Sequence, residues 1–374
     1  MKKIIFLTTS HHYLDDRIFY HQALSLAEKK FEVKIVSLSS DFISNIRGIQ
    51  IESSNILNSS IKNKVDYIIK ILNDYNPHIA ICSEPLAVYA ASKYSRYKSC
   101  KIVYDITEWY PSKKQLNSLN IFKKISTFIV LTFYNILVGA KSSGFIFGEI
   151  HKQFPFKQIF PRKPSIILPY YPSQKYISFS KKSIPDDVLK LCYTGRISKE
   201  KGIENFFKAL NVFRNKYSIP FQIIIIGKCN NNVDLLFFND LIKKYNFENI
   251  VISEPIEFEK FSETISNVDI CFDLRDNDFE NNHCLPIKLF YYMACGKPVI
   301  YTDLKSIRNF VEMEKVGILV NPYNYDEIAD NIYKYTIDNA NLYTIHSSNA
   351  RLFFLEKYNW ELIKERFVGF INNL

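Results

Sequence analysis

Short apolar runs alternate with longer mixed segments along the first half of the chain. The runs are KIIFLTT, FEVKIVSL, IRGIQIE, HIAICS, KIVYD and GFIF. Helix-length segments separate them, and the clearest cover residues 16–30, 61–75 and 85–94. Apolar runs of this length, spaced by helices, are typical of parallel strands in a doubly wound sheet.

The second half repeats the same pattern. Its runs are VLKLCYTG, FQIIIIG, NIVIS, VDICFD, KPVIY and VGILV. Two successive α/β units predict an α/β protein with two Rossmann-like domains. We expect the first domain over residues 1–170, a proline- and serine-containing linker over 171–187, and the second domain over 188–355. An amphipathic helix over 356–374 completes the chain.

The segment from Phe122 to Phe147 is the most apolar part of the first half. Its apolar core, Ile125 to Ala140, has about sixteen residues, whereas a membrane span needs roughly twenty. We therefore do not expect a span. Two interpretations stay open: a buried crossover helix before GFIF, which we favour, or a helix lying in a lipid interface between flanking lysines.

Composition narrows the class of protein and its partners. A length of 374 residues favours two domains. The net charge of +10 suits nucleic acid, anionic lipid or phosphorylated substrates, but the lysines form no arginine-rich run, which disfavours nucleic acid. A solvated basic surface and attraction to the inner face of a membrane remain equal alternatives. Seven cysteines without C-x-x-C spacing predict a reducing, cytoplasmic environment, and the N-terminus is expected to be a strand, not a signal peptide.

Two segments of the second half could bind an anion together. In HCLPIKLFYYMACGKPVIY, Pro286 suits the first position of a buried helix and Gly296 can end it, so the helix N-terminus is available to an anion. In LCYTGRISKEKGIENFFKAL, Gly195, Arg196 and Lys201 follow a strand, where open α/β sheets bind ligands. Two cations beside a helix N-terminus would suit a diphosphate.

These segments resemble the retaining glycosyltransferases of family 4, of the kind that build bacterial surface polysaccharides. YTGRISKEKG is similar to their G-R-x-x-x-x-K-G signature, and LPIKLFYYMACGKPVIYTD is similar to their P-x-K segment. VGILVNPYNYDEIADNI and DDRIFYHQALSLAEKKFEVKIVS resemble two further segments. The resemblance implies the GT-B fold: two domains facing across a cleft, an acceptor bound by the first, and a nucleotide-sugar donor bound by the second. It also implies that the C-terminal helix crosses back to the first domain.

The resemblance implies roles for residues in the second domain. Arg196 and Lys201 would bind the donor diphosphate and stabilise the departing nucleotide, so they are the catalytic candidates, and no metal or other cofactor is expected. The sequence has no Asp-x-Asp pair with hydrophobic flanks that would hold a metal ion. The expected donor-binding residues are Gly195, Ile256, Leu285, Pro286, Lys288 and Tyr291.

The second domain also departs from the family pattern. Its Glu-x7-Glu positions are occupied by His283 and Tyr291, and a tyrosine cannot accept hydrogen bonds from two ribose hydroxyls as a carboxylate can. Asp278 or Glu280 would replace the earlier glutamate only if the loop turned them inward; solvated loop acids are the simpler interpretation.

The first domain contains a second departure. KIVYDITEWYP resembles a segment whose family histidine is Thr107 here. Glu108 is the remaining candidate for a catalytic contact with the acceptor, with a helix cap or salt bridge as the equal alternative. Asp16, Arg17 and Trp109 are the expected acceptor-binding residues, although Asp16 could simply cap the first helix. His11 and His12 follow the first strand and could touch the acceptor.

The sequence thus predicts transfer of a hexose or related sugar from a nucleotide-sugar to a glycan or lipid-linked acceptor, with retention of configuration. The alternative is a GT-B scaffold that binds a sugar-nucleotide or glycan but has lost its chemistry with its carboxylates. An epimerase on the same fold and a nucleic-acid binder are weaker hypotheses.

Overall fold

The protein divides into two compact units, each built around its own sheet. The computed structural model describes residues 1–116, 119–179, 188–336 and 340–374. Unit 1 comprises Met1–Tyr170 together with Glu361–Leu374, and unit 2 comprises Tyr171–Trp360. Of the linker expected over 171–187, residues 171–179 lie in unit 2, and the others lie outside the described residues.

Unit 1 contains an eight-stranded sheet in the order β3-β4-β2-β1-β5-β6-β7-β8. All neighbouring strands pair in parallel except β3 and β4. The strands are β1 (Lys3–Leu7), β2 (Glu32–Ser37), β3 (Phe42–Ile46), β4 (Ile49–Ser53), β5 (Ile79–Cys82), β6 (Lys101–Ile106), β7 (Gly144–Phe147) and β8 (Ser165–Ile167). The short strands β3 and β8 were not expected from the sequence, because neither is a long apolar run.

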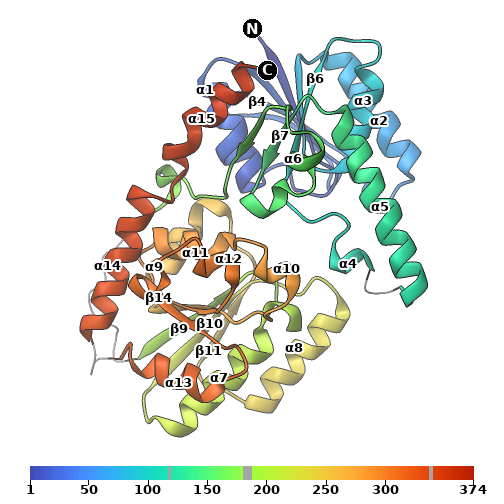
Figure 1. Cartoon of the computed structure of the whole chain (residues 1–374). Helices are drawn as coiled ribbons and strands as arrows, with labels where there is room; N and C mark the ends of the chain where they lie inside the picture. The colour runs from blue at the N-terminus through green and yellow to red at the C-terminus, as the bar shows by residue number, and fades with distance from the viewer. Residues whose placement is uncertain (117–118, 180–187, 337–339) are drawn as a thin grey trace. The chain divides into compact units, whose positions relative to one another are not determined.

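Helices cover both faces of this sheet (Figure 1). α2, α3 and α5 lie on one side, whereas η1, α1 and α15 lie on the other. The helices of the unit are η1 (Asp16–Ala23), α1 (Leu24–Glu28), α2 (Ile61–Tyr75), α3 (Pro85–Tyr94), α4 (Lys113–Leu116), α5 (Ile121–Lys141), η2 (Ile150–Gln153), α6 (Phe156–Ile159) and α15 (Trp360–Asn372). The segment expected as one helix over 16–30 begins with a π-helix, η1, that continues as α1.

Unit 2 contains a six-stranded parallel sheet in the order β11-β10-β9-β12-β13-β14. This is the 3-2-1-4-5-6 order of a Rossmann sheet, and its strand order reverses between β9 and β12. The strands are β9 (Leu189–Thr194), β10 (Phe221–Ile226), β11 (Ile250–Ser253), β12 (Ile270–Asp273), β13 (Val299–Thr302) and β14 (Gly317–Val320). All six were predicted from their apolar runs.

Two helical layers enclose the second sheet, with α7, α8 and α13 on one face and α9, α11, α12 and α14 on the other (Figure 1). The longer helices are α7 (Ile203–Lys216), α8 (Asn232–Tyr245), α11 (Ile287–Ala294), α13 (Tyr325–Tyr333) and α14 (Ala340–Glu356). The shorter ones are η3 (Gln174–Tyr176), η4 (Lys199–Lys201), η5 (Phe258–Lys260), α9 (Phe261–Ser266), α10 (Phe279–Asn282), α12 (Lys305–Arg308) and η6 (Met313–Lys315). Phe206, Phe207 and Phe272 are central to the buried core.

The C-terminal segment returns to unit 1, of which residues 361–374 are part. Lys364 pairs with Glu28, and Glu365 is 3.0 Å from Lys29. Lys2 Nζ donates to the carbonyl oxygen of Asn372 at 3.0 Å. Helix α15 begins at Trp360, a few residues after the bound expected from the sequence, because residues 357–359 separate it from α14.

Helix α5 differs most from expectation. We favoured a buried crossover helix for this segment, but only 11% of its most apolar window is buried. Of its residues, only Asn135, Val138 and Gly139 are fully buried. The expectation was wrong because an apolar sequence does not show whether the rest of the fold supplies a covering layer.

Candidate functional site

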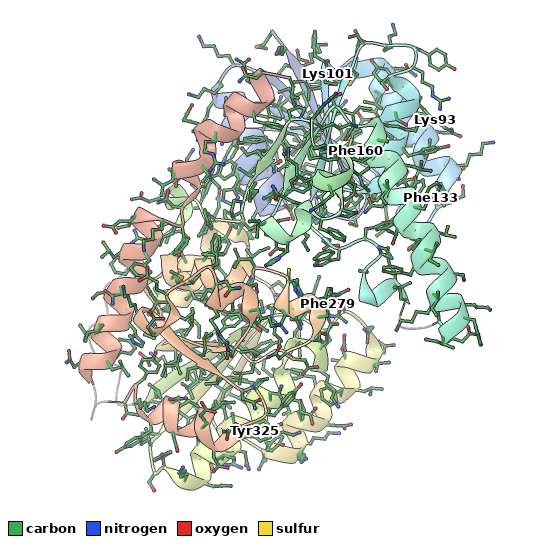
Figure 2. The ribbon with its side chains drawn as sticks, viewed as in Figure 1. Lys93, Lys101, Phe133, Phe160, Phe279 and Tyr325 are labelled. Atoms are coloured by element: carbon green, nitrogen blue, oxygen red, sulfur yellow. The ribbon has the colours of Figure 1, made fainter. Side chains whose placement is uncertain are left out.

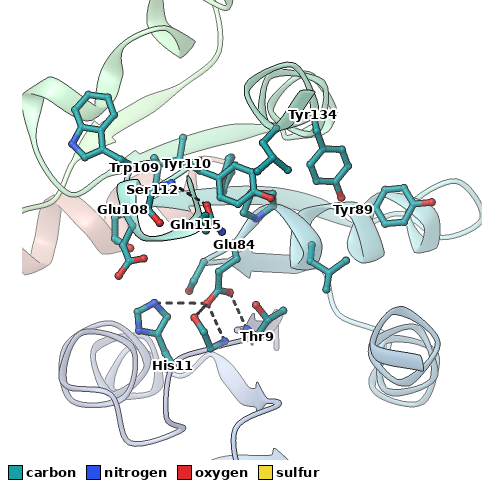
Figure 3. A pocket seen from close by; sticks show the side chains of 18 of the residues that line it. Thr9, His11, Glu84, Tyr89, Glu108, Trp109, Tyr110, Ser112, Gln115 and Tyr134 are labelled. Carbon is teal, nitrogen blue, oxygen red and sulfur yellow. Dashed lines mark hydrogen bonds and ion pairs between the residues drawn. The ribbon is translucent and has the colours of Figure 1, made fainter. Parts of the chain in front are cut away.

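A cavity of unit 1 opens where the order of its sheet reverses. It has a volume of about 740 Å³ and lies at the carboxyl ends of β1, β5 and β6 (Figure 3). Open α/β sheets bind ligands at such reversals, because the loops after neighbouring strands diverge there. The lining includes Thr9, Ser10, His11, Ser83, Glu84, Tyr89, Tyr104, Thr107, Glu108, Trp109, Tyr110 and Tyr134.

Glu84 is the most highly connected polar side chain of this cavity. Its carboxylate accepts hydrogen bonds from the backbone N–H groups of Thr9 (2.9 Å) and Ser10 (3.2 Å). It also accepts from the hydroxyls of Thr8 (3.0 Å) and Ser10 (2.7 Å), as Figure 3 shows in part. Glu84 therefore fixes the loop after β1 against the start of α3.

His11 is held among acids at the same end of the sheet. Its Nδ1 is 3.4 Å from Asp15 and its Nε2 is 3.7 Å from Glu84. Burial alone would lower the pKa of His11, but Asp15, Glu84 and Glu108 outweigh it and raise the pKa to about 9. His11 is thus an imidazolium at neutral pH, and the cavity contains a cation beside two carboxylates.

This shift predicts a pH-dependent contribution to stability. Because the folded pKa of His11 lies above its ordinary value of 6.5, its contribution is complete below pH 6.5 and is lost as the pH rises through 9. We expect the stability of wild type relative to His11→Gln to fall by as much as about 3 kcal/mol over this window. Urea unfolding of unit 1, at pH values from roughly 6 to roughly 9.5 that bracket the two pKa values, measures this difference in the free energy of unfolding.

His12 provides the matched control for this measurement. Burial lowers the pKa of His12, so His12→Gln should change the pH dependence in the opposite direction, with wild type losing relative stability as the pH falls. If the difference in the free energy of unfolding between wild type and His11→Gln did not change over the same range of roughly pH 6 to 9.5, the charge assigned to His11 would be contradicted.

Arg17 lies in the interior of unit 1 and not at the cavity. Its Nε and Nη2 atoms donate to the two carboxylate oxygens of Asp105 at 3.2 and 2.9 Å. Nη1 donates to the carbonyl oxygen of Leu168 at 2.7 Å, and Gln22 donates to the same Asp105 carboxylate at 2.8 Å. Arg17 is 2% exposed, so this guanidinium joins η1 to β6 and the end of β8.

The remaining predicted residues of unit 1 fall into two groups. Glu108 and Trp109 line the cavity, together with Thr107 at the position of the family histidine. Asp16 lies at the start of η1, where its carboxylate accepts from the N–H of Arg17 at 2.9 Å. The cap of η1 is its neighbour Asp15, which accepts from the N–H groups of Arg17 and Ile18.

Three cationic residues lie on the two segments that meet at Gly195, where the order of the second sheet reverses. Arg196 and Lys201 follow β9, whereas Lys288 comes from the first turn of α11. A Cβ at Gly195 would lie 2.9 Å from Lys288 Nζ, and the φ of +97° is a backbone conformation that favours glycine. Arg196 Nη2 donates to Asp234 at 2.9 Å, and Lys201 Nζ lies 3.4 Å from Glu200.

Lys288 is held between the end of β9 and the end of β12. Its ammonium donates to the carbonyl oxygen of Thr194 and lies 3.6 Å from Asp273. Burial lowers the pKa of Lys288 to about 8; Asp273 opposes the shift, and Arg275 and Lys201 reinforce it. Lys201 is therefore close enough to repel Lys288, which places two ammonium groups at one end of β9.

Asp273, the last residue of β12, organises the base of this cluster. It accepts from Arg275 Nε and the hydroxyl of Tyr301, each at 2.7 Å. Burial alone would raise the pKa of Asp273, but Arg275 and Lys288 hold it well below its usual range. The carboxylate thus stays charged and keeps Arg275 and Lys288 in place.

Other predicted donor residues lie around α11. Pro286 is the N-cap of the helix and not its first residue, and its side chain has no group that could accept from the helix N–H groups. Leu285 and Ile256 are half-buried in the flanking loops. Tyr291 packs edge-on against Phe258 and Phe261, with ring centroids 5.9 and 5.7 Å away.

In the loop before α11, Asp278 has a structural role at the start of a short helix. Asp278 caps α10 and accepts from the N–H of Asn281 at 2.9 Å. Nδ1 of His283 is 2.8 Å from the carbonyl oxygen of Phe279. Among the residues that the structure describes, no group of three or more His, Cys, Asp or Glu side chains is placed to hold a metal ion.

Sequence reasoning did not select Glu84, Asp273 or Arg275. The available signal was position: Glu84 and Arg275 follow predicted strands, and Asp273 ends one. Loops after parallel strands share one edge of the sheet, so polar residues there could have been grouped as candidates.

Comparisons with known proteins agree with this geometry. Residues 174–353 match the family model "Glycosyl transferases group 1". An uncharacterised glycosyltransferase from Methanocaldococcus jannaschii is 28% identical over 173 residues. That match spans 46% of this chain and 42% of the relative, less than half the length of either.

Solved structures match over the whole chain. Sucrose-phosphate synthase from Thermosynechococcus elongatus has a TM-score of 0.78 at 14% identity and covers 100% of this chain and 99% of its own. Anabaena HepE in complex with UDP-glucose has a TM-score of 0.73 at 13% identity, with both chains fully covered. At such low sequence identities, these TM-scores establish the fold alone. The chain therefore has the GT-B fold, and its residues 174–353, just under half of its length, match the family model of the glycosyl transferases group 1.

Proposed function

We propose that this protein transfers a hexose or related sugar from a nucleotide-sugar to a glycan or lipid-linked acceptor in cell-surface polysaccharide synthesis. Following its family, the reaction would retain the anomeric configuration and would use no metal ion. The observation that carries the proposal is that Lys288, in the first turn of α11, lies against Gly195 and close enough to Lys201 to be repelled by it, while Arg196 follows Gly195 at the end of β9.

This cluster suits a leaving nucleoside diphosphate. Negative charge develops on the distal phosphate as its bond to the sugar breaks, and preplaced cations lower the free energy of that state more than that of the bound donor. The N–H groups of α11 add partial positive charge. Gly195 supports the proposal because its missing side chain allows a phosphate to approach the backbone.

The cavity of unit 1 is the candidate acceptor site. Glu108 is exposed at its edge and could accept a hydrogen bond from an acceptor hydroxyl, while the aromatic residues Trp109 and Tyr110 offer surfaces on which a sugar ring can pack. His11, charged at neutral pH, would orient an acceptor that carries an anionic group. Arg17 has no place in this acceptor site, since Asp105 and Leu168 occupy its donors.

A catalytically inactive scaffold is the second candidate. Its support is specific: His283, Tyr291 and Thr107 occupy positions where the family has two carboxylates and a histidine, and Tyr291 packs among phenylalanines. A scaffold would bind a nucleotide-sugar without releasing the nucleotide.

A panel of UDP- and GDP-sugars separates the two candidates. UDP-glucose is the first probe, because the similar Anabaena HepE structure contains it. An enzyme should release UDP or GDP slowly from one donor even without acceptor, and that donor should raise the thermal midpoint. A thermal shift without release would favour the scaffold, and neither effect with any donor would reject both.

Donor binding should also depend on the titration of Lys288. Since a diphosphate raises the pKa of an adjacent ammonium, binding takes up a proton wherever the free lysine has begun to lose it, above its pKa of about 8. We expect the affinity for UDP to fall about tenfold between pH 7 and pH 9.5. The corresponding change in binding free energy is on the order of that for a pKa shift of one unit. Calorimetry in buffers of different ionisation enthalpy measures the proton uptake.

Lys288→Arg is the control for this measurement. A guanidinium has a pKa of about 12.5 or more, so the affinity of this variant for UDP should be nearly independent of pH over the same range. A profile as steep as that of wild type would assign the titration to another group.

A further inference from the structure

Helix α5 exposes large apolar side chains around its N-terminal half. Phe122 is 83% exposed and Phe133, labelled in Figure 2, is 62% exposed. The exposed large apolar residues of the helix are Ile121, Phe122, Ile125, Phe128, Ile129, Val130, Phe133 and Leu137. Scattered single apolar residues are ordinary on a surface, but a contiguous helix of them marks an interaction site.

The C-terminal half of α5 is fixed in unit 1. Asn135 accepts a hydrogen bond from the hydroxyl of Tyr104 at 2.8 Å, and Val138 is buried. A Cβ at Gly139 would meet the ring of Phe156 at 2.6 Å, so α6 packs closely on this turn. The helix connects β6 to β7, which pair in parallel. It is long and apolar enough to cross a membrane, but crossing would break these contacts.

The charge around this helix is strongly one-sided. α5 contains three lysines and no acid. Residues 109–164, which include it, contain eight lysines, one arginine and a single acid, Glu149, so this stretch holds most of the net charge of +10. Lys123 and Lys124 lie in the first turns, where cations oppose the helix dipole. Lys123 and Lys124 therefore do not stabilise the helix itself.

We propose that the N-terminal half of α5, residues 121–133, docks onto an anionic lipid bilayer. Its apolar side chains would enter the boundary between headgroups and acyl chains, and Lys123 and Lys124 would contact anionic headgroups. A second copy of the chain is a poorer occupant, because two such surfaces in an isologous contact would bring like charges together.

The cavity of unit 1 continues onto the same surface. Val130, Leu131 and Tyr134 of α5 line it, and Val130 is one of the exposed residues of the docking surface. Docking would therefore bring the cavity to the lipid surface. Resting on the proposed transfer reaction, this consequence favours a lipid-linked acceptor over a free glycan; the docking itself does not depend on that reaction.

Vesicle flotation tests the proposal on the full-length protein without donor or acceptor. We expect wild type to float with vesicles of equimolar phosphatidylglycerol and phosphatidylcholine. The triple variant Phe122→Ser/Ile125→Ser/Ile129→Ser, none of whose positions lines the cavity, should bind with a partition coefficient at least about tenfold lower, since each exposed side chain contributes through its buried apolar area. Lys123→Gln/Lys124→Gln should lose about tenfold and become less sensitive to salt.

A matched triple variant controls for the removal of exposed apolar groups in general. Val233→Ser/Leu235→Ser/Leu236→Ser changes three exposed residues of α8 in unit 2 and should float like wild type. The proposal is overturned if wild type does not float, or if the α5 triple variant floats equally well. It is also overturned if lipid-free sedimentation shows a dimer of wild type that the α5 variant abolishes, because the surface would then belong to a second copy.

Discussion

Lys201→Met is expected to lower kcat for nucleotide release about 10²- to 10³-fold. This is the size of effect that follows when one group that stabilises developing charge is removed from an active site. Lys201 approaches the site of Lys288 and Gly195, and its charge would matter most when the leaving phosphate carries its full negative charge. The Kd for the donor should change much less than kcat, because in the proposed site Arg196 and the α11 N-terminus would also contact the charge of the bound donor. Pre-steady-state release of UDP or GDP, with the donor found by the panel, measures both.

Lys199 makes a matched control for Lys201. It lies two residues earlier in the same turn, its side chain is 72% exposed, and it pairs with Glu204 at 3.4 Å. Lys199→Met should therefore keep kcat within about twofold, as expected for an exposed ion pair. Equal losses for the two variants would show that the turn contributes by general electrostatics, and an unchanged kcat for Lys201→Met would remove it from the leaving-group site.

Local sequence signals predicted the elements of the fold well. Helix α2 spans the expected residues 61–75 because Ser60 caps its start and Asn76, in the left-handed conformation, ends it. Gly202 opens α7 and Gly296 ends α11, as their positions after a turn and a buried helix suggested. Such ends depend on a few neighbouring residues, so one sequence is enough to locate them.

The partners of charged residues could not be predicted in the same way. Arg17 and Asp105 are 88 residues apart, and Lys288 reaches a carbonyl oxygen 94 residues away. No local pattern distinguishes the arginine that is buried with an aspartate from one that faces a ligand. The exposure of α5 was unpredictable for a related reason, since the apolar periodicity of a helix does not show which faces have neighbours.

The pair of Arg17 and Asp105 leads to the largest expected effect on stability. Both side chains are nearly fully buried, and the pair is bidentate. Arg17→Met leaves the Asp105 carboxylate with Gln22 as its remaining side-chain donor and removes the hydrogen bond to Leu168. Breaking a buried ion pair from one side costs about 3 to 5 kcal/mol, so we expect unit 1 to lose that much of its free energy of unfolding.

The chain has two tryptophans, which allows this loss to be assigned to one unit. In a Trp360→Phe background, fluorescence of Trp109 follows unit 1 alone during urea unfolding. Lys29→Met, which removes an exposed pair with Glu365, should cost less than about 1 kcal/mol. Arg17→Met/Asp105→Leu should be more stable than Arg17→Met, because no unpaired charge remains buried. If the double variant were no better than the single one, hydrogen bonding to Leu168 and packing, not the buried carboxylate, would account for the loss.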